Sequence, residues 1–142
     1  MKRNQTSEKP FSCLMQLQSD GKWSFILSEI LLFWEKRTFD KIVFVLPNFN
    51  KEDCTMFETL PQDKIKIYDS YHPSISKHIC NDRMNHKKNC NMFFVFHAVD
   101  KDVLQTDEML QKLYMLPRTY NMYTWIMANP HVSIPNRLKE CS

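Results

Sequence analysis

The chain has 142 residues, which suits one domain and excludes two full-sized domains. Hydrophobic residues make up 43% of the chain and aromatic residues 13%, and this much apolar surface excludes a globally disordered protein. The formal net charge of +3 is compatible with a polyanionic partner such as DNA but does not indicate one. Only one glycine is present, Gly21, which argues against any glycine-rich phosphate-binding loop.

The sequence contains no stretch that is long and apolar enough to cross a membrane. Its longest apolar run, residues 26–34, is interrupted by Ser28 and Glu29 and falls far short of the roughly 20 residues that a spanning helix needs. The basic N-terminus is followed by neither the apolar core nor the cleavage site of a signal peptide. We therefore expect an intracellular protein that contacts no membrane and keeps its five cysteines reduced.

The first half of the chain alternates between apolar runs and helical periodicity. We expect residues 1–10, which are polar and end in proline, to be a disordered lead-in, and residues 11–142 to form a single domain. The next predicted elements, in chain order, are a buried strand at 11–17, an amphipathic helix at 22–36, a strand covered on both faces at 41–46, a short helix at 52–60 and, at 64–68, a strand that lies at an edge or is covered on a single face.

The second half begins with residues 71–91, a polar segment that we interpret as a solvated loop. The elements predicted after it are a fully apolar strand at 92–96, a helix at 102–116 and a third apolar strand at 122–127, with no element beyond residue 130. This order of strands and helices predicts an α/β domain with a mostly parallel sheet and helices on both of its faces.

The turn after the first strand occupies the place of a P-loop. The motif G-x-x-x-x-G-K-[ST] aligns with the eight residues that end at Trp23, but only Gly21 and Lys22 match it. Gln16 replaces the first glycine, whose missing side chain lets the backbone approach phosphate. Asp20 adds a negative charge, and Trp23 replaces the hydroxyl residue that holds Mg²⁺. Taken alone, the Gly-Lys pair is a weak signal, and a helix start after a turn is the simpler interpretation.

Several other segments give this pair more weight. They are Phe39–Pro47, Phe93–Phe96, Leu113–Met122, Trp125–Asn129 and Ile134–Leu138. Through them the chain resembles the DNA-packaging ATPases of large eukaryotic DNA viruses, which belong to the FtsK/HerA type of P-loop ATPases. The resemblance covers about residues 11–140. It implies a three-layer P-loop NTPase-like fold with a mostly parallel sheet, shortened and incomplete at its C-terminus. Under it we expect Leu14 and Phe94 on neighbouring central strands of one sheet.

The resemblance assigns a residual nucleotide site to Gly21, Lys22 and Trp23, with Lys22 at the position of the P-loop lysine. The Walker B strand of this family ends in two acidic residues, but His97 and Ala98 stand at those positions here. A neutral histidine cannot supply the negative charge that a magnesium site requires.

Two further residues match family positions. Arg118 corresponds to the arginine of an Arg-Tyr-Asn segment and could reach a nucleotide on a neighbouring subunit, although a surface arginine beside Pro117 is the simpler interpretation. Asn129 corresponds to a polar sensor residue that is usually glutamine. Together with His97 these are the candidates at catalytic positions, and no catalytic role is assigned to any of them.

Loss of the first loop glycine, the magnesium hydroxyl and both Walker B acids removes most of the electrostatic stabilisation that phosphoryl transfer needs. We therefore expect a degenerate ATPase-like protein that does not hydrolyse ATP, has no firm cofactor and acts as a binding or assembly module. The implied partners are further copies of the chain, an active ATPase subunit or double-stranded DNA, and the implied location of a viral protein is the host cytoplasm or the virion.

Two alternatives remain open. In the first, the chain is a weakly active P-loop ATPase that binds ATP and Mg²⁺ and works in DNA packaging, with Asp100 or a partner subunit supplying the missing charge. In the second, it is a small α/β interaction protein unrelated to this family.

A cluster of potential metal ligands occurs in the polar segment before the Walker B strand. Its members are His72, His78, Cys80, His86 and Cys90. The cluster lacks the close paired spacing of a zinc site, such as C-x₂-C, so we interpret the segment as solvated and assign no metal site. Cysteine catalysis is also disfavoured, because Cys13 lies in a predicted core strand, where a thiol is inert.

Overall fold

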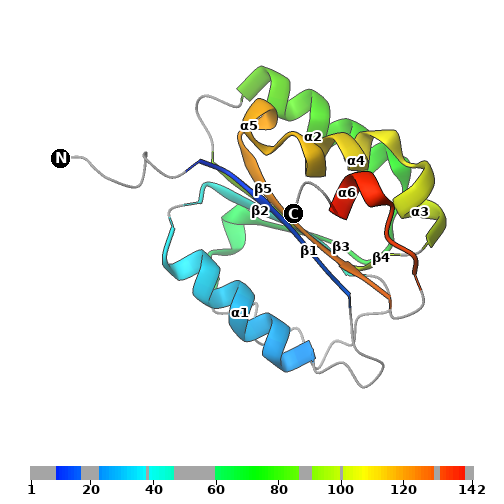
Figure 1. Cartoon of the computed structure of the whole chain (residues 1–142). Coiled ribbons are helices and arrows are strands. Elements are labelled where there is room, and N and C mark those ends of the chain that lie inside the picture. Colours follow the sequence, from blue (N-terminus) through cyan, green and yellow to red (C-terminus); the bar gives the residue numbers. More distant parts are fainter. Residues whose placement is uncertain are drawn as a thin grey trace.

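A five-stranded, wholly parallel β-sheet forms the middle layer of the molecule (Figure 1). The computed structural model describes residues 9–16, 23–37, 39–46, 60–86, 91–99, 101–129 and 132–139. The strands are β1 (Ser12–Gln16), β2 (Lys41–Val45), β3 (Ile65–Tyr68), β4 (Met92–Val99) and β5 (Met122–Ala128). They lie side by side in the order β1-β5-β4-β2-β3.

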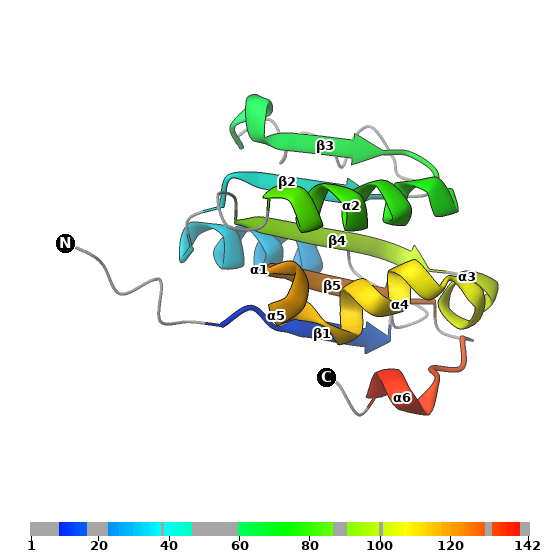
Figure 2. The same cartoon turned by 90° about the horizontal axis from the view of Figure 1, so that it is seen from above.

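Helices cover both faces of this sheet, as Figures 1 and 2 show. One face is covered by α1 (Trp23–Glu35). The other is covered by α2 (Pro73–His86), α3 (Lys101–Thr106), α4 (Glu108–Met115), α5 (Pro117–Tyr120) and α6 (Asn136–Lys139), and a 3₁₀ turn, η3 (Gln62–Lys64), precedes β3. The predicted three-layer α/β architecture, consistent with a P-loop-like fold, is therefore confirmed.

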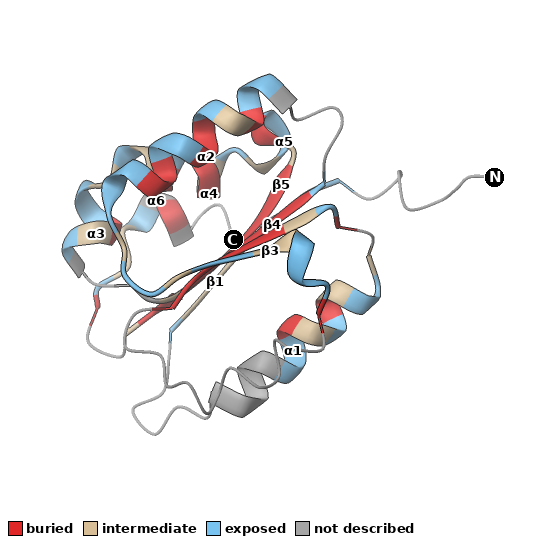
Figure 3. Cartoon of the chain, turned by 180° about the vertical axis from the view of Figure 1, so that it is seen from behind, coloured by how far each residue is buried: buried red, intermediate tan, exposed pale blue. Residues whose placement is uncertain are grey.

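The three central strands are buried on both faces because their apolar residues are continuous. Along β4, Phe94 and Phe96 pack in the core under α2 and α4, whereas Phe93 and Val95 pack in the core over α1. All seven residues of β5 are buried. Figure 3 shows these strands as the buried middle of the molecule, with exposed residues on the outer sides of the helices. The strands predicted at 41–46, 92–96 and 122–127 are thus confirmed.

The two edges of the sheet are formed by β1 and β3. The edge position of β3 is one of the two alternatives predicted from its alternating sequence. The prediction of a buried first strand, with Leu14 and Phe94 on neighbouring central strands, was wrong. Leu14 pairs with Ile126 of β5, and Ile126 pairs in turn with Phe96 of β4, so β5 lies between the two strands. Only Ser12 of β1 is fully buried, because the strand has a neighbour on one side.

Residues 71–91 contain a helix where a solvated loop was predicted. The helix α2 spans 14 residues, and Ile75, Ile79 and Cys80 form the narrow apolar stripe that it buries. Its remaining positions are mostly polar, which concealed the periodicity. The helix predicted at 102–116 is divided in two, because the side chain of Asp107 accepts a hydrogen bond from the Leu110 backbone N–H and so begins a new helix, α4. Most of the helix predicted at 52–60 lies outside the described residues.

A fully buried arginine joins α2 to the start of β5. The Nε of Arg83 donates to the Tyr120 carbonyl at 3.0 Å, and Nη2 donates to the Asn121 carbonyl at 2.9 Å. Asn121 ends α5 in the left-handed region with φ of 52°. The guanidinium therefore donates to two carbonyls at the end of α5, where the turn into β5 begins.

We expect Arg83→Met to lower the free energy of unfolding by about 3 kcal/mol, because the substitution keeps most of the side-chain volume but leaves these buried carbonyls without a charged donor. Urea denaturation of the wild-type and variant chains measures the change. An exposed arginine provides the control: Arg118→Met is expected to change the same free energy by less than about 0.5 kcal/mol. A similar loss in both variants would contradict the role given to Arg83.

Candidate functional site

The carboxyl ends of all five strands meet at one edge of the sheet, where ligands of open α/β folds bind. The strands β2 and β4 are neighbours. After β2 the chain continues to β3 on one side of this pair, and after β4 it continues to β5 on the other side. The carboxyl ends of β2 and β4 therefore border the point at which the connections change direction. In Figure 2 this edge carries α3, and the opposite edge carries α5.

Two residues singled out by the sequence meet at this edge. The side-chain amide of Gln16, at the end of β1, donates to the Val132 carbonyl at 2.9 Å and approaches the Asn129 carbonyl at 3.4 Å. Gln16 stands where a P-loop has its first glycine. Its side chain instead ties the end of β1 to the segment after β5, so the position serves to hold two strand ends together.

His97 lies in an irregularity of β4 at the same edge. Phe96 pairs with Ile126 and Val99 pairs with Ala128, so three steps along β4 match two steps along β5. This extra residue is a β-bulge, a feature that is frequent beside functional sites and changes the direction of a side chain. Burial lowers the pKa of the His97 imidazole to about 4. The side chain at the expected acidic position is therefore neutral at pH 7.

The remaining sequence-predicted site residues are not gathered here. Gly21, Lys22 and Asp100 lie outside the described residues, and Trp23 is the first residue of α1. Arg118 is exposed on α5, at the amino end of β5, and so lies at the edge opposite to Gln16, His97 and Asn129 (Figure 2). Arg118 is thus a surface residue of this chain, and its contact with a nucleotide on a neighbouring subunit stays a prediction.

A crevice of about 580 Å³ opens at the carboxyl edge, between the start of α2 and the helices α3 and α4. Its central polar contact joins Tyr71 to Asp107: the tyrosine hydroxyl donates to the carboxylate and also contacts the Ser76 hydroxyl. Burial and the bond to Asp107 raise the pKa of Tyr71. Because the same carboxylate begins α4 through Leu110 and Ser76 lies on α2, these groups are already occupied in linking α2 to α4.

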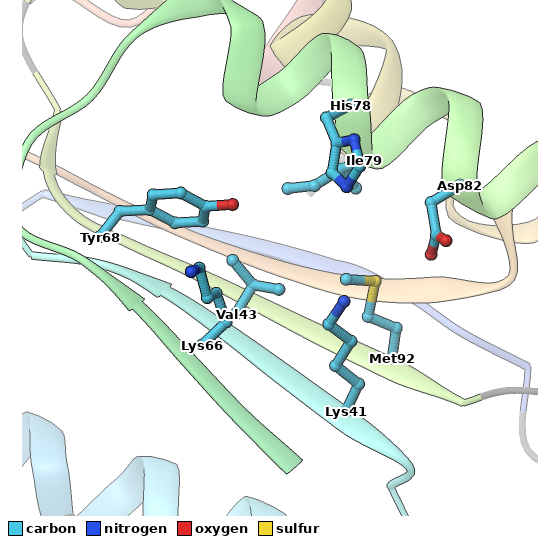
Figure 4. A pocket seen from close by; sticks show the side chains of 8 residues that line it. All are labelled: Lys41, Val43, Lys66, Tyr68, His78, Ile79, Asp82 and Met92. Atoms are coloured by element: carbon cyan, nitrogen blue, oxygen red, sulfur yellow. The ribbon is translucent and has the colours of Figure 1, made fainter. Parts of the chain in front are cut away.

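A second pocket, of about 330 Å³, lies between α2 and the strands β2 and β3 (Figure 4). Polar side chains reach it from two sides: Lys41 and Lys66 from the strands, and His78 and Asp82 from α2. Sequence reasoning missed this group because α2 had been interpreted as a loop. The available signal was the spacing of His78 and Asp82, which places both side chains on one side of a helix.

The structure offers no metal centre among the residues that it describes: no three histidine, cysteine, aspartate or glutamate side chains gather there. Cys90 of the predicted cluster lies outside the described residues, and nothing is described of the His86 side chain. Burial raises the pKa of both the Cys13 and the Cys80 thiol, which keeps them protonated and unreactive at neutral pH. None of the described helices has the length and apolar character needed to cross a membrane.

Neither the family models nor the curated proteins compared with this chain match it.

The bulge histidine predicts a pH dependence of stability. The folded-state pKa of His97 lies near 4 and the unfolded value near 6.5, so between these values the unfolded chain binds a proton that the folded chain does not. Stability should therefore fall as the pH drops from about 6.5 towards 4, and His97 should contribute no change above that window. Urea denaturation at several pH values should show a smaller loss for His97→Asn than for the wild type. Equal losses would contradict the burial assigned to this imidazole.

Proposed function

We propose that this chain is a degenerate P-loop-type domain, related to the viral DNA-packaging ATPases that its sequence resembles, and that it acts as a binding or assembly module without hydrolysing ATP. The observation that carries the proposal is the neutral His97 in the bulge that ends β4. Phosphoryl transfer depends on Mg²⁺ and on a group that positions the attacking water, and both functions normally fall to carboxylates. The described ends of β1, β4 and β5 contribute Gln16, His97 and Asn129, none of which is acidic.

The architecture supports a retained structural role. The central strands are buried on both faces, and the Gln16 amide braces two strand ends at the edge where a nucleotide would bind. A domain that keeps its core and its edge contacts can still pack against an active subunit or bind an anionic partner, although Gln16, His97 and Asn129 supply no carboxylate at the ends of β1, β4 and β5. For this reason we favour a module that binds or assembles over a slow enzyme.

The proposal predicts that the full chain releases no inorganic phosphate from ATP above the protein-free rate, with or without Mg²⁺. Lys22→Ala should give the same rate as the wild type, because the sequence around the lysine lacks the first loop glycine and the Mg²⁺-binding hydroxyl on which stabilisation of the transition state depends. Phosphate release over hours at high protein concentration measures both rates.

Magnesium-dependent turnover that Lys22→Ala abolishes would contradict the proposal and favour the weakly active ATPase. Binding to duplex DNA at low salt and sedimentation as an oligomer, alone or with an active ATPase subunit, are the outcomes that support a module. A chain that binds neither ATP nor duplex DNA and sediments as a monomer would favour an unrelated α/β interaction protein.

A further inference from the structure

We propose that the pocket under α2 binds a small organic phosphate. The pocket is distinct from the residual P-loop. It is lined from β2, β3, α2 and Met92 at the start of β4, whereas the P-loop motif begins at Gln16, the last residue of β1, which is the strand at the opposite edge of the sheet. The inference therefore does not depend on the proposed function.

The first argument is the placement of two lysines on the covered face of the sheet. Val43 lies in the core beneath α2, and Lys66 pairs with it in register, so both side chains project to the same face. Lys41 precedes Val43 by two residues and shares that face by strand alternation. The half-buried Lys41 and the more exposed Lys66 thus enter one pocket from neighbouring strands.

The second argument is charge. The pocket lining holds two ammonium groups and one carboxylate, Asp82, so the two lysines and the aspartate together leave a net charge of +1. Within the described part of the chain, no ion pair joins either lysine to a carboxylate, and Lys66 has only the Tyr68 ring at 5.3 Å. Two like charges on one covered face repel each other, and an anion between them removes this repulsion.

The third argument is the match between the donors and a phosphate group. Lysine ammonium groups bind phosphate as point charges with several donors each, and the His78 imidazole can add one N–H. Figure 4 shows both lysines below α2, with His78 and Asp82 on the helix above them and Tyr68 beside Lys66. A phosphate group offers three terminal oxygens to this set, whereas a carboxylate offers two.

The fourth argument is the size and the floor of the pocket. Its volume of about 330 Å³ lies at the lower end of the range for ligand pockets and exceeds the space that a bare phosphate fills. Buried Val43, Ile79 and Met92 form an apolar floor suited to the carbon skeleton of a ligand. The Asp82 carboxylate can accept a hydrogen bond from a ligand hydroxyl or amino group.

Isothermal titration of the full chain at low ionic strength tests the inference with three probes: glycerol 3-phosphate, inorganic phosphate and glycerol. We expect glycerol 3-phosphate to bind, inorganic phosphate to bind more weakly and glycerol not to bind. Tighter binding of inorganic phosphate would overturn the assignment to an organic phosphate. Absence of heat with both anions at millimolar concentration would overturn the site altogether.

Variants locate the binding. Lys41→Met and Lys66→Met should each weaken glycerol 3-phosphate binding at least about tenfold, because each removes a charged donor and retains an apolar chain of similar length. Lys112→Met, at an exposed position of α4 outside the pocket, is the matched control and should leave affinity unchanged. Equal weakening by all three would show non-specific attraction and contradict the proposal.

Asp82→Asn provides a test in which the expected result is stronger binding. It removes the pocket carboxylate without changing its size, so it should tighten the binding of inorganic phosphate. Unchanged or weaker phosphate binding by Asp82→Asn would contradict the placement of the anion. Lys22→Ala should bind the probes like the wild type, which separates this pocket from the residual P-loop.

Discussion

The burial of three continuous apolar strands on both faces is the constraint on which the structure depends. Phe93, Phe94, Val95 and Phe96 in β4 have no solvent-facing side, so helices must cover the sheet above and below. On the face that α1 covers, Phe33 packs its ring against Phe93 and Trp125 at centroid distances of 4.8 and 4.7 Å. The guanidinium of Arg37 lies 3.8 Å from the centre of the same ring and covers its outer side.

The apolar runs made the central strands predictable, because a buried strand needs no information beyond its own residues. Helix α2 was missed because its buried stripe is narrow and includes the polar Ser76 and the charged Arg83 among apolar residues. The cost of burying Arg83 is offset by carbonyls of Tyr120 and Asn121, 37 and 38 residues away along the chain. A local pattern cannot reveal such a distant partner. The segment therefore showed no recognisable helical periodicity and was interpreted as a loop.

The order of the strands in the sheet was the second feature that could not be predicted from the sequence. Every strand of a parallel sheet sends its carboxyl end to one edge, so the fold class alone indicates the edge at which ligands bind. Which strands are neighbours depends instead on side-chain packing between distant segments, and β5 came to lie between β1 and β4. The meeting of Gln16 with the backbone after Asn129 and the bulge at His97 both follow from this order, and neither has a signature in the sequence.

The non-acidic end of β4 could be recognised from the sequence, whereas the pocket under α2 could be recognised only from the structure. That positions 97 and 98 are not acidic is visible in the sequence, and the structure adds that burial keeps the His97 imidazole neutral at pH 7. The pocket under α2 is a property of packing: Lys41 and Lys66 become neighbours only when β2 and β3 pair, and Asp82 faces them only because residues 73–86 are helical. Lys41 is half-buried and Lys66 is exposed, so their like charges repel each other in a partly solvated pocket. One carboxylate opposite two ammonium groups balances half of their charge, which is why we propose a bound anion as the source of the remainder.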